Sequence, residues 1–174
     1  MGIQFETDYN METLTAMAKG LRKTVRKKRS RRVHIFAAVV LILGLLTILA
    51  TTAGGEPLGA SGVVTLLAML VVILVNLVED RLNAWFARKR LLPGTEHAAA
   101  TFEEDGYVSA TGVTESRFSY AQIVAVAETA RYFVFALSSH HTQAYDKRTI
   151  RGGSVEDFRA FIAEKTGKPI ANIK

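Results

Sequence analysis

Two long blocks without charged side chains constrain this chain more than any other feature of its sequence. No Asp, Glu, Lys or Arg occurs in residues 33–55, and after Glu56 none occurs in residues 57–78. A helix of about 20 apolar residues crosses the roughly 30 Å hydrocarbon core of a bilayer, and both blocks exceed that length. We therefore predict an integral membrane protein with a two-helix hairpin, whose spans lie at residues 33–53 and 62–86.

Basic residues flank these spans on one side only. Nine of them lie between Lys19 and Arg32, and more follow the second span, whereas residues 51–62 contain none. Lys and Arg beside membrane helices stay cytoplasmic, so we expect a two-pass protein of the cell inner membrane, with both termini in the cytoplasm and loop 54–61 outside. The predicted membrane-interface residues, called the collar below, are Arg26, Lys27, Lys28, Arg29, Arg31, Arg32, Trp85, Arg88, Lys89 and Arg90.

The net charge of +6 comes from this basic segment, because the rest of the chain holds 13 basic against 16 acidic residues. One interpretation is a topology signal with solvated charges. A second is attraction of anionic lipid headgroups, at roughly 1 kcal/mol for each Lys or Arg near the membrane. Nucleic-acid binding normally adds aromatic or base-reading residues, and none is interleaved here. We therefore expect the lipid bilayer as partner, and no nucleic acid.

A cleaved signal peptide is the competing interpretation of the first block. Its apolar core would hold about 7–15 residues and start close to the N-terminus, whereas this block is longer and starts at Val33. The chain also has no cysteine, which agrees with a domain kept in a reducing cytoplasm.

The segments outside the hairpin divide into three parts. Residues 1–32 are predicted as a cytoplasmic strand and basic amphipathic helix, since residues 2–7 alternate apolar and polar side chains. The helix is expected to begin near Tyr9 and to continue into the first span as one rod of about 60 Å. Residues 87–99 are a linker, and residues 100–174 form a cytoplasmic β-domain with a C-terminal helix.

Short segments rich in β-branched and aromatic residues predict an antiparallel sheet or half-barrel in this C-terminal domain. Asp105 and Gly106 tolerate positive φ and predict a hairpin turn. Ser154, with Asp157 three residues later, predicts a helix N-cap, and Gly167 a helix end. Strands followed by one helix indicate a membrane α+β fold. The strands are expected at residues 100–103, 107–111, 115–120, 123–129, 132–138 and 142–146.

The sequence lacks the usual supports of catalysis. No Gly-x-Ser-x-Gly, Walker or dinucleotide motif occurs, and His140 and His141 are adjacent in an expected turn. We therefore predict no catalytic residue, no metal site and no cofactor. A helix N-terminus with cationic side chains can hold an anion, although solvated charges beside a capped helix are the alternative. The candidate anion-binding residues are Lys147, Arg148, Arg151, Ser154, Arg117 and Arg131.

Several short motifs recur in a fixed order around the hairpin. They are residues 101–106 (TFEEDG), 118–123 (FSYAQI), 126–129 (VAET), 146–148 (DKR) and 158–161 (FRAF). With the N-terminal strand and helix, this order resembles the YcxB-like family, in which a C-terminal domain follows two transmembrane helices. The resemblance implies a cytoplasmic sheet-plus-helix domain similar to pleckstrin-homology folds, and it brings no established activity.

Two functional hypotheses follow from these features. The first is a non-enzymatic two-pass membrane protein whose pleckstrin-homology-like domain serves regulation or interaction, with a protein partner or a second copy of the chain as candidate partners. The alternative is a cyclic-nucleotide-responsive membrane effector, because the layout resembles the two-transmembrane β-barrel effectors of antiphage systems in architecture alone. An enzyme acting on lipid headgroups would need convergent carboxylates or histidines, which the spacing does not indicate.

Overall fold

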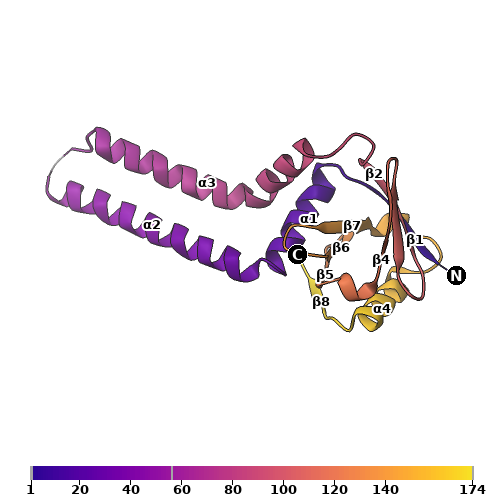
Figure 1. Ribbon diagram of the computed structural model, residues 1–174. Coiled ribbons are helices and arrows are strands. Elements are labelled where there is room, and N and C mark those ends of the chain that lie inside the picture. Colours follow the sequence, from indigo (N-terminus) through magenta and orange to yellow (C-terminus); the bar gives the residue numbers. More distant parts are fainter. Residues whose placement is uncertain (1, 56, 174) are drawn as a thin grey trace.

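The computed structural model describes residues 2–55 and 57–173, so that Met1, Glu56 and Lys174 lie outside the described residues. It shows an α+β domain at one end of a long helical hairpin (Figure 1). The hairpin consists of α2 (Lys27–Ala53) and α3 (Ala60–Lys89). The prediction of an α+β chain with two long apolar helices is therefore confirmed.

The hairpin exposes most of its large apolar side chains. No part of the most apolar window of either helix is buried, and side chains such as Phe36 and Leu77 are 70% and 76% exposed. Both helices are long and apolar enough to cross a membrane. They pack closely at Gly44, where a Cβ would lie 2.8 Å from the sulfur of Met69, as small residues allow between membrane helices.

The first helix of the chain, α1 (Met11–Lys23), does not continue into α2. The Oδ1 atom of Asn10 accepts hydrogen bonds from the backbone of Glu12 and Thr13 at its start, as an N-cap does. At its end Thr24 leaves helical geometry, with φ −110° and ψ −91°. The predicted continuous rod is therefore wrong, because α1 must bury its apolar side against the sheet while α2 extends away from the domain.

Eight strands form two four-stranded sheets, in the orders β1-β2-β3-β4 and β7-β6-β5-β8. All neighbours are antiparallel except β5 and β8. The strands of the first sheet are β1 (Ile3–Asp8), β2 (His97–Phe102), β3 (Tyr107–Thr111) and β4 (Glu115–Phe118). Those of the second are β5 (Ala125–Glu128), β6 (Tyr132–Ala136), β7 (Thr142–Asp146) and β8 (Ile170–Asn172).

The six strands expected in residues 100–146 are confirmed, with shorter bounds at several ends. Strand β2 instead begins earlier, at His97, and α3 continues to Lys89, so the linker predicted at residues 87–99 is too long at both ends. Residues 120–122 form a 3-10 turn instead of the end of a strand, because Ser119 and Gln122 cap it reciprocally. The parallel strand β8 was not predicted. It is only three residues long and follows Pro169, and Ile173 N donates to Glu128 O at 2.7 Å beyond it.

The second sheet is buried on both faces, which explains why all five residues of β6 are buried. Phe133 and Phe135 face an aromatic core shared with the first sheet. Val134 faces α1, where a Cβ on Gly20 would lie 2.8 Å from its Cγ1 atom. A strand covered on both faces reads as a continuous apolar run instead of an alternating one.

The predicted C-terminal helix is α4 (Val155–Thr166). Ser154 and Asp157 form the expected capping box, with each side chain accepting from the other's backbone N–H at 3.0 Å. Gly167 ends the helix with φ +61°, a conformation that glycine adopts without strain. Phe158 points from α4 into the core and is completely buried.

Strand β1 makes the N-terminal segment part of the C-terminal domain. Phe5 is 1% exposed and lies in the shared core, with its ring centroid 5.8 Å from Phe102 and 5.7 Å from Tyr145. Thr7 Oγ1 accepts from the backbone of Asp146 at the corner between the sheets. The helical hairpin is thus an insertion between α1 and β2 of one domain.

We expect that residues 95–174 expressed alone will not fold, because they lack β1 and Phe5. Residues 1–24 joined by a short Gly-Ser loop to residues 79–174 should fold, since Arg22 of α1 already meets Asp80 of α3 at 2.6 Å. The measurement is near-UV circular dichroism of the tyrosines during thermal unfolding, recorded for both polypeptides. Cooperative unfolding of residues 95–174 would contradict the expectation.

Candidate functional site

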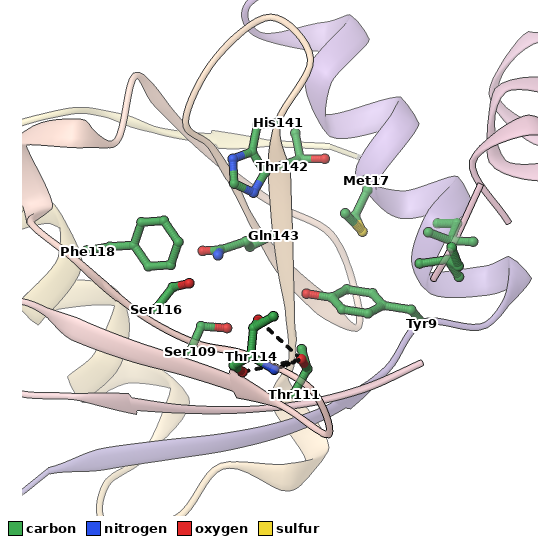
Figure 2. A pocket seen from close by; sticks show the side chains of 12 residues that line it. Tyr9, Met17, Ser109, Thr111, Thr114, Ser116, Phe118, His141, Thr142 and Gln143 are labelled. Atoms are coloured by element: carbon green, nitrogen blue, oxygen red, sulfur yellow. Dashed lines mark hydrogen bonds between the residues drawn. The ribbon is translucent and has the colours of Figure 1, made fainter. Parts of the chain in front are cut away.

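A pocket of about 370 Å³ opens between the two sheets, beside α1 (Figure 2). We call it the intersheet pocket. Residues from β3, β4, β7, α1 and the segment after α3 meet here, although they are far apart in the sequence. Its lining residues are Tyr9, Leu14, Met17, Leu91, Ser109, Thr111, Thr114, Ser116, Phe118, His141, Thr142 and Gln143.

Hydroxyl groups cover the wall formed by β3 and β4. On β3, alternate residues share a face, so Ser109 and Thr111 continue the face on which Tyr107 lies in the core. Ser109 is paired with Ser116 across the two strands. Thr111 Oγ1 also accepts from the backbone of Thr114 at 3.2 Å. The sheet thus changes from an aromatic interior to a polar opening.

Gln143 presents a hydrogen-bond donor to this opening. Its Oε1 atom accepts from Tyr107 at 2.7 Å and from Tyr145 at 2.8 Å, which leaves the amide nitrogen to face the pocket. Among the described residues this nitrogen has no hydrogen-bond acceptor, although the side chain belongs to a residue only 6% exposed. Burial raises the pKa of Tyr107 and of Tyr145 above the usual value, so both phenols remain donors.

The polar lining of the intersheet pocket includes the imidazole of His141, which is able to carry a positive charge. None of its lining residues is Asp, Glu, Lys or Arg, and burial raises the pKa of Tyr9 to about 12. Figure 2 shows the hydroxyl of Tyr9 and the amide of Gln143 among hydroxyl-bearing side chains, with Phe118 and Met17 as apolar walls. The lining thus offers hydroxyl and amide groups for hydrogen bonding beside apolar walls.

The candidate anion-binding residues lie in ion pairs instead of around one open site. Lys147 donates to Glu128 at 2.8 Å. Arg131 and Arg148 both contact the carboxylate of Asp146, at 2.8 and 3.0 Å.

The remaining three candidates contact neither Asp146 nor Glu128 among the described residues. Arg151 pairs with Glu6 of β1 at 3.3 Å, and Arg117 pairs with Glu103 at 3.2 Å. Ser154 caps α4 through Asp157. The structure brings Arg131, Lys147 and Arg148 together around two buried carboxylates, and it does not bring Arg117, Arg151 or Ser154 to them.

Glu128 is the carboxylate that Lys147 contacts, and sequence reasoning did not single it out. Arg159 of α4 holds it with two hydrogen bonds of 2.8 Å, and Lys147 adds the third contact. These contacts, led by the hydrogen bond from Arg159, lower the pKa of Glu128 to about 2. The pairing joins β5, η2 (Lys147–Thr149) and α4, so no local pattern could have revealed it.

The collar residues lie where the hairpin meets the domain, at the start of α2 and the end of α3. Arg26 donates to the backbone oxygen of Ser139 in the β6–β7 turn at 2.7 Å. Lys89 lies 3.7 Å from the centroid of the Trp85 ring. Within residues 2–55 and 57–173, no group of three or more His, Asp or Glu side chains is arranged to hold a metal ion.

The two sheets, the capping helix and the inserted hairpin define a class of protein: a small α+β domain carried by two helices that are long and apolar enough to span a membrane. The chain contains a YcxB-like domain, because residues 102–162 match the sequence model of the family described as YcxB-like protein. The predicted resemblance is thereby confirmed over residues 102–162. No curated protein and no solved structure matches the chain.

Proposed function

We propose that this chain is a two-pass inner-membrane protein whose cytoplasmic domain has a pleckstrin-homology-like fold and acts in regulation or interaction, without catalysis. The observation that carries the proposal is the uncovered apolar surface of the hairpin. Apolar patches of more than a few hundred Å² are rare on soluble monomers, and here the most apolar window of each of the two helices is uncovered. A lipid bilayer covers such helices.

The charges at the two ends of the hairpin support this placement. Basic residues gather at the end nearest the domain, and the described residues between α2 and α3 carry no Lys or Arg. Because Lys and Arg beside membrane helices remain cytoplasmic, this asymmetry supports a cytoplasmic location for the domain and both termini. The collar then lies at the level of anionic lipid headgroups.

The arrangement of the domain supports the pleckstrin-homology-like fold. Two sheets pack around one aromatic core, and α4 covers that core with Phe158 and Ile162. The family match over residues 102–162 covers the middle of this domain.

The contacts of α1 support a regulatory role. The helix lies against the second sheet, and its Arg22 makes two hydrogen bonds of 2.7 and 2.6 Å to Asp80 of α3. Leu14 and Met17 of α1 also line the intersheet pocket, together with Leu91 just after α3. A ligand or protein segment in this pocket would therefore touch both chain segments that lead into the hairpin.

Ion pairing supports a non-catalytic role for the buried carboxylates. Asp146 and Glu128 are each held by two basic side chains. The hydrogen bond from Arg159 lowers the pKa of Glu128 to about 2, whereas a general acid or base needs a pKa near the working pH. The cyclic-nucleotide alternative gains no support from the intersheet pocket, because none of its lining residues is Lys or Arg.

Reporter fusions test the proposed topology. Alkaline phosphatase inserted at Gly54–Gly55 should be active, because this enzyme needs the periplasm, and a fluorescent protein fused after the C-terminus should fluoresce. Alkaline phosphatase at the C-terminus should be inactive. Periplasmic activity at the C-terminus would contradict the topology, and extraction of the untagged protein by alkaline carbonate would contradict membrane insertion itself.

A further inference from the structure

A second cavity, of about 620 Å³, lies where the hairpin joins the domain. We call it the juxtamembrane cleft. Its walls come from α1, from the first turns of α2, from the last turns of α3 and from the β6–β7 turn. Basic side chains from separate elements meet here, since Arg29 comes from α2, Arg90 follows α3 and His140 belongs to the β6–β7 turn.

Two of these cations lack a counter-charge. Among the described residues, Arg29 and Arg90 have no carboxylate partner, whereas Arg22 in the same cleft is paired with Asp80. Arg26 contacts a backbone oxygen of the β6–β7 turn. Glu79 also lines the cleft, and its carboxylate lies 3.7 Å from Arg22 and 3.9 Å from His34.

The cleft is polar on one side and apolar on the other. Leu21, Val33 and Phe86 line it together with the arginines. Val33 and Phe86 are 50% and 46% exposed, and they belong to the helices that carry the uncovered apolar surface. A molecule with an anionic group and an adjoining acyl chain matches both parts of this lining.

We propose that the juxtamembrane cleft binds the phosphate group of an anionic membrane phospholipid, with Arg29 and Arg90 as its ligands and the acyl chains along α2 and α3. The proposal rests on the membrane insertion proposed above. Guanidinium groups suit phosphate because their N–H donors form a planar fork. The lipid would link α2, α3 and the β6–β7 turn, and so fix the orientation of the domain on the membrane.

The test uses the full chain purified in mild detergent and examined by native mass spectrometry. Phosphatidylglycerol and phosphatidylcholine are added in equal amounts, and retained lipid is counted. We expect wild-type protein to retain phosphatidylglycerol preferentially. The double variant Arg29→Gln with Arg90→Gln should reduce this retention about tenfold, since two charge-assisted contacts are lost. Restoring the charge with lysine at both positions should recover part of it.

The matched control is the double variant Arg32→Gln with Arg88→Gln. Both residues belong to the collar, but neither lines the cleft. Their substitution removes the same amount of positive charge as the cleft variant does. This control should change retention less than twofold. If both double variants lose phosphatidylglycerol retention equally, diffuse attraction to the collar explains the binding and the proposal is overturned. Unchanged retention in the Arg29→Gln, Arg90→Gln variant would also overturn it. Native tyrosine circular dichroism in every variant shows that the domain is folded.

A soluble competitor separates the lipid from a free phosphate. Glycerol 1-phosphate in large excess should not displace phosphatidylglycerol, because it lacks the acyl chains that the apolar lining holds. Displacement would reassign the cleft to a soluble phosphate. Carbonate extraction of wild-type membranes separates the two proposals: an extractable protein contradicts membrane insertion, whereas an integral protein without preference for phosphatidylglycerol contradicts the cleft alone.

Discussion

Replacing Phe158 by alanine is expected to lower the free energy of unfolding of the domain by about 3–5 kcal/mol, the usual cost of removing a buried phenylalanine. Phe158 is fully buried. Its ring centroid lies 4.6 Å from Phe5, 4.8 Å from Phe102 and 5.0 Å from Phe133. One side chain of α4 thus contacts β1, β2 and β6, and its loss leaves a cavity that rigid strands cannot fill.

Denaturant unfolding of the full chain in mild detergent measures this loss. The near-UV circular dichroism of tyrosine reports on the domain, because Tyr107, Tyr120, Tyr132 and Tyr145 all lie in its sheets or turns. Val124→Ala is the matched control, since Val124 is 49% exposed and should change stability by less than about 0.5 kcal/mol. A similar small change for Phe158→Ala would show that α4 is not anchored in the core.

Replacing Glu128 by glutamine is expected to destabilise the domain by about 3–5 kcal/mol, the range for breaking a buried ion pair by removing one partner. The Glu128 side chain is 7% exposed, and that of Lys147 is 13% exposed. Glutamine keeps the volume but leaves Lys147 and Arg159 without their shared carboxylate. Glu156→Gln is the control, because Glu156 also contacts Arg159 but its side chain is 75% exposed. Equal midpoints of denaturation for the two variants would contradict the prediction.

The same carboxylate predicts how stability depends on pH. The pKa of Glu128 is about 2 in the folded protein, below the ordinary value of 4.5 that it regains on unfolding. A carboxyl group with a lowered folded pKa contributes stability that is complete above its unfolded pKa and is lost as the pH falls toward the folded pKa. Wild-type protein should therefore lose stability between about pH 5 and pH 2 more steeply than Glu128→Gln. If the free energy of unfolding falls equally with pH in wild type and in Glu128→Gln, this prediction is contradicted.

Local patterns in the sequence were sufficient for the elements that depend on local physics. The two apolar spans follow from charge-free length, the collar from its Lys and Arg residues, and α4 from the cap at Ser154 and the stop at Gly167. The strands of residues 100–146 followed from β-branched and aromatic content and from turn residues. Each of these signals lies within about twenty consecutive residues, so a single sequence contains it.

Only the tertiary structure decided which distant segments meet. It placed β1 beside β2 across the inserted hairpin, ended α1 at Thr24 and added β8 beside β5. It also paired Lys147 with Glu128 and brought Ser109 and Gln143 into the lining of the same pocket. Periodicity and capping report the local environment of each segment, whereas these contacts depend on how separate elements pack and share charge. That is why the hairpin was evident from the sequence, while both cavities became visible only in the folded chain.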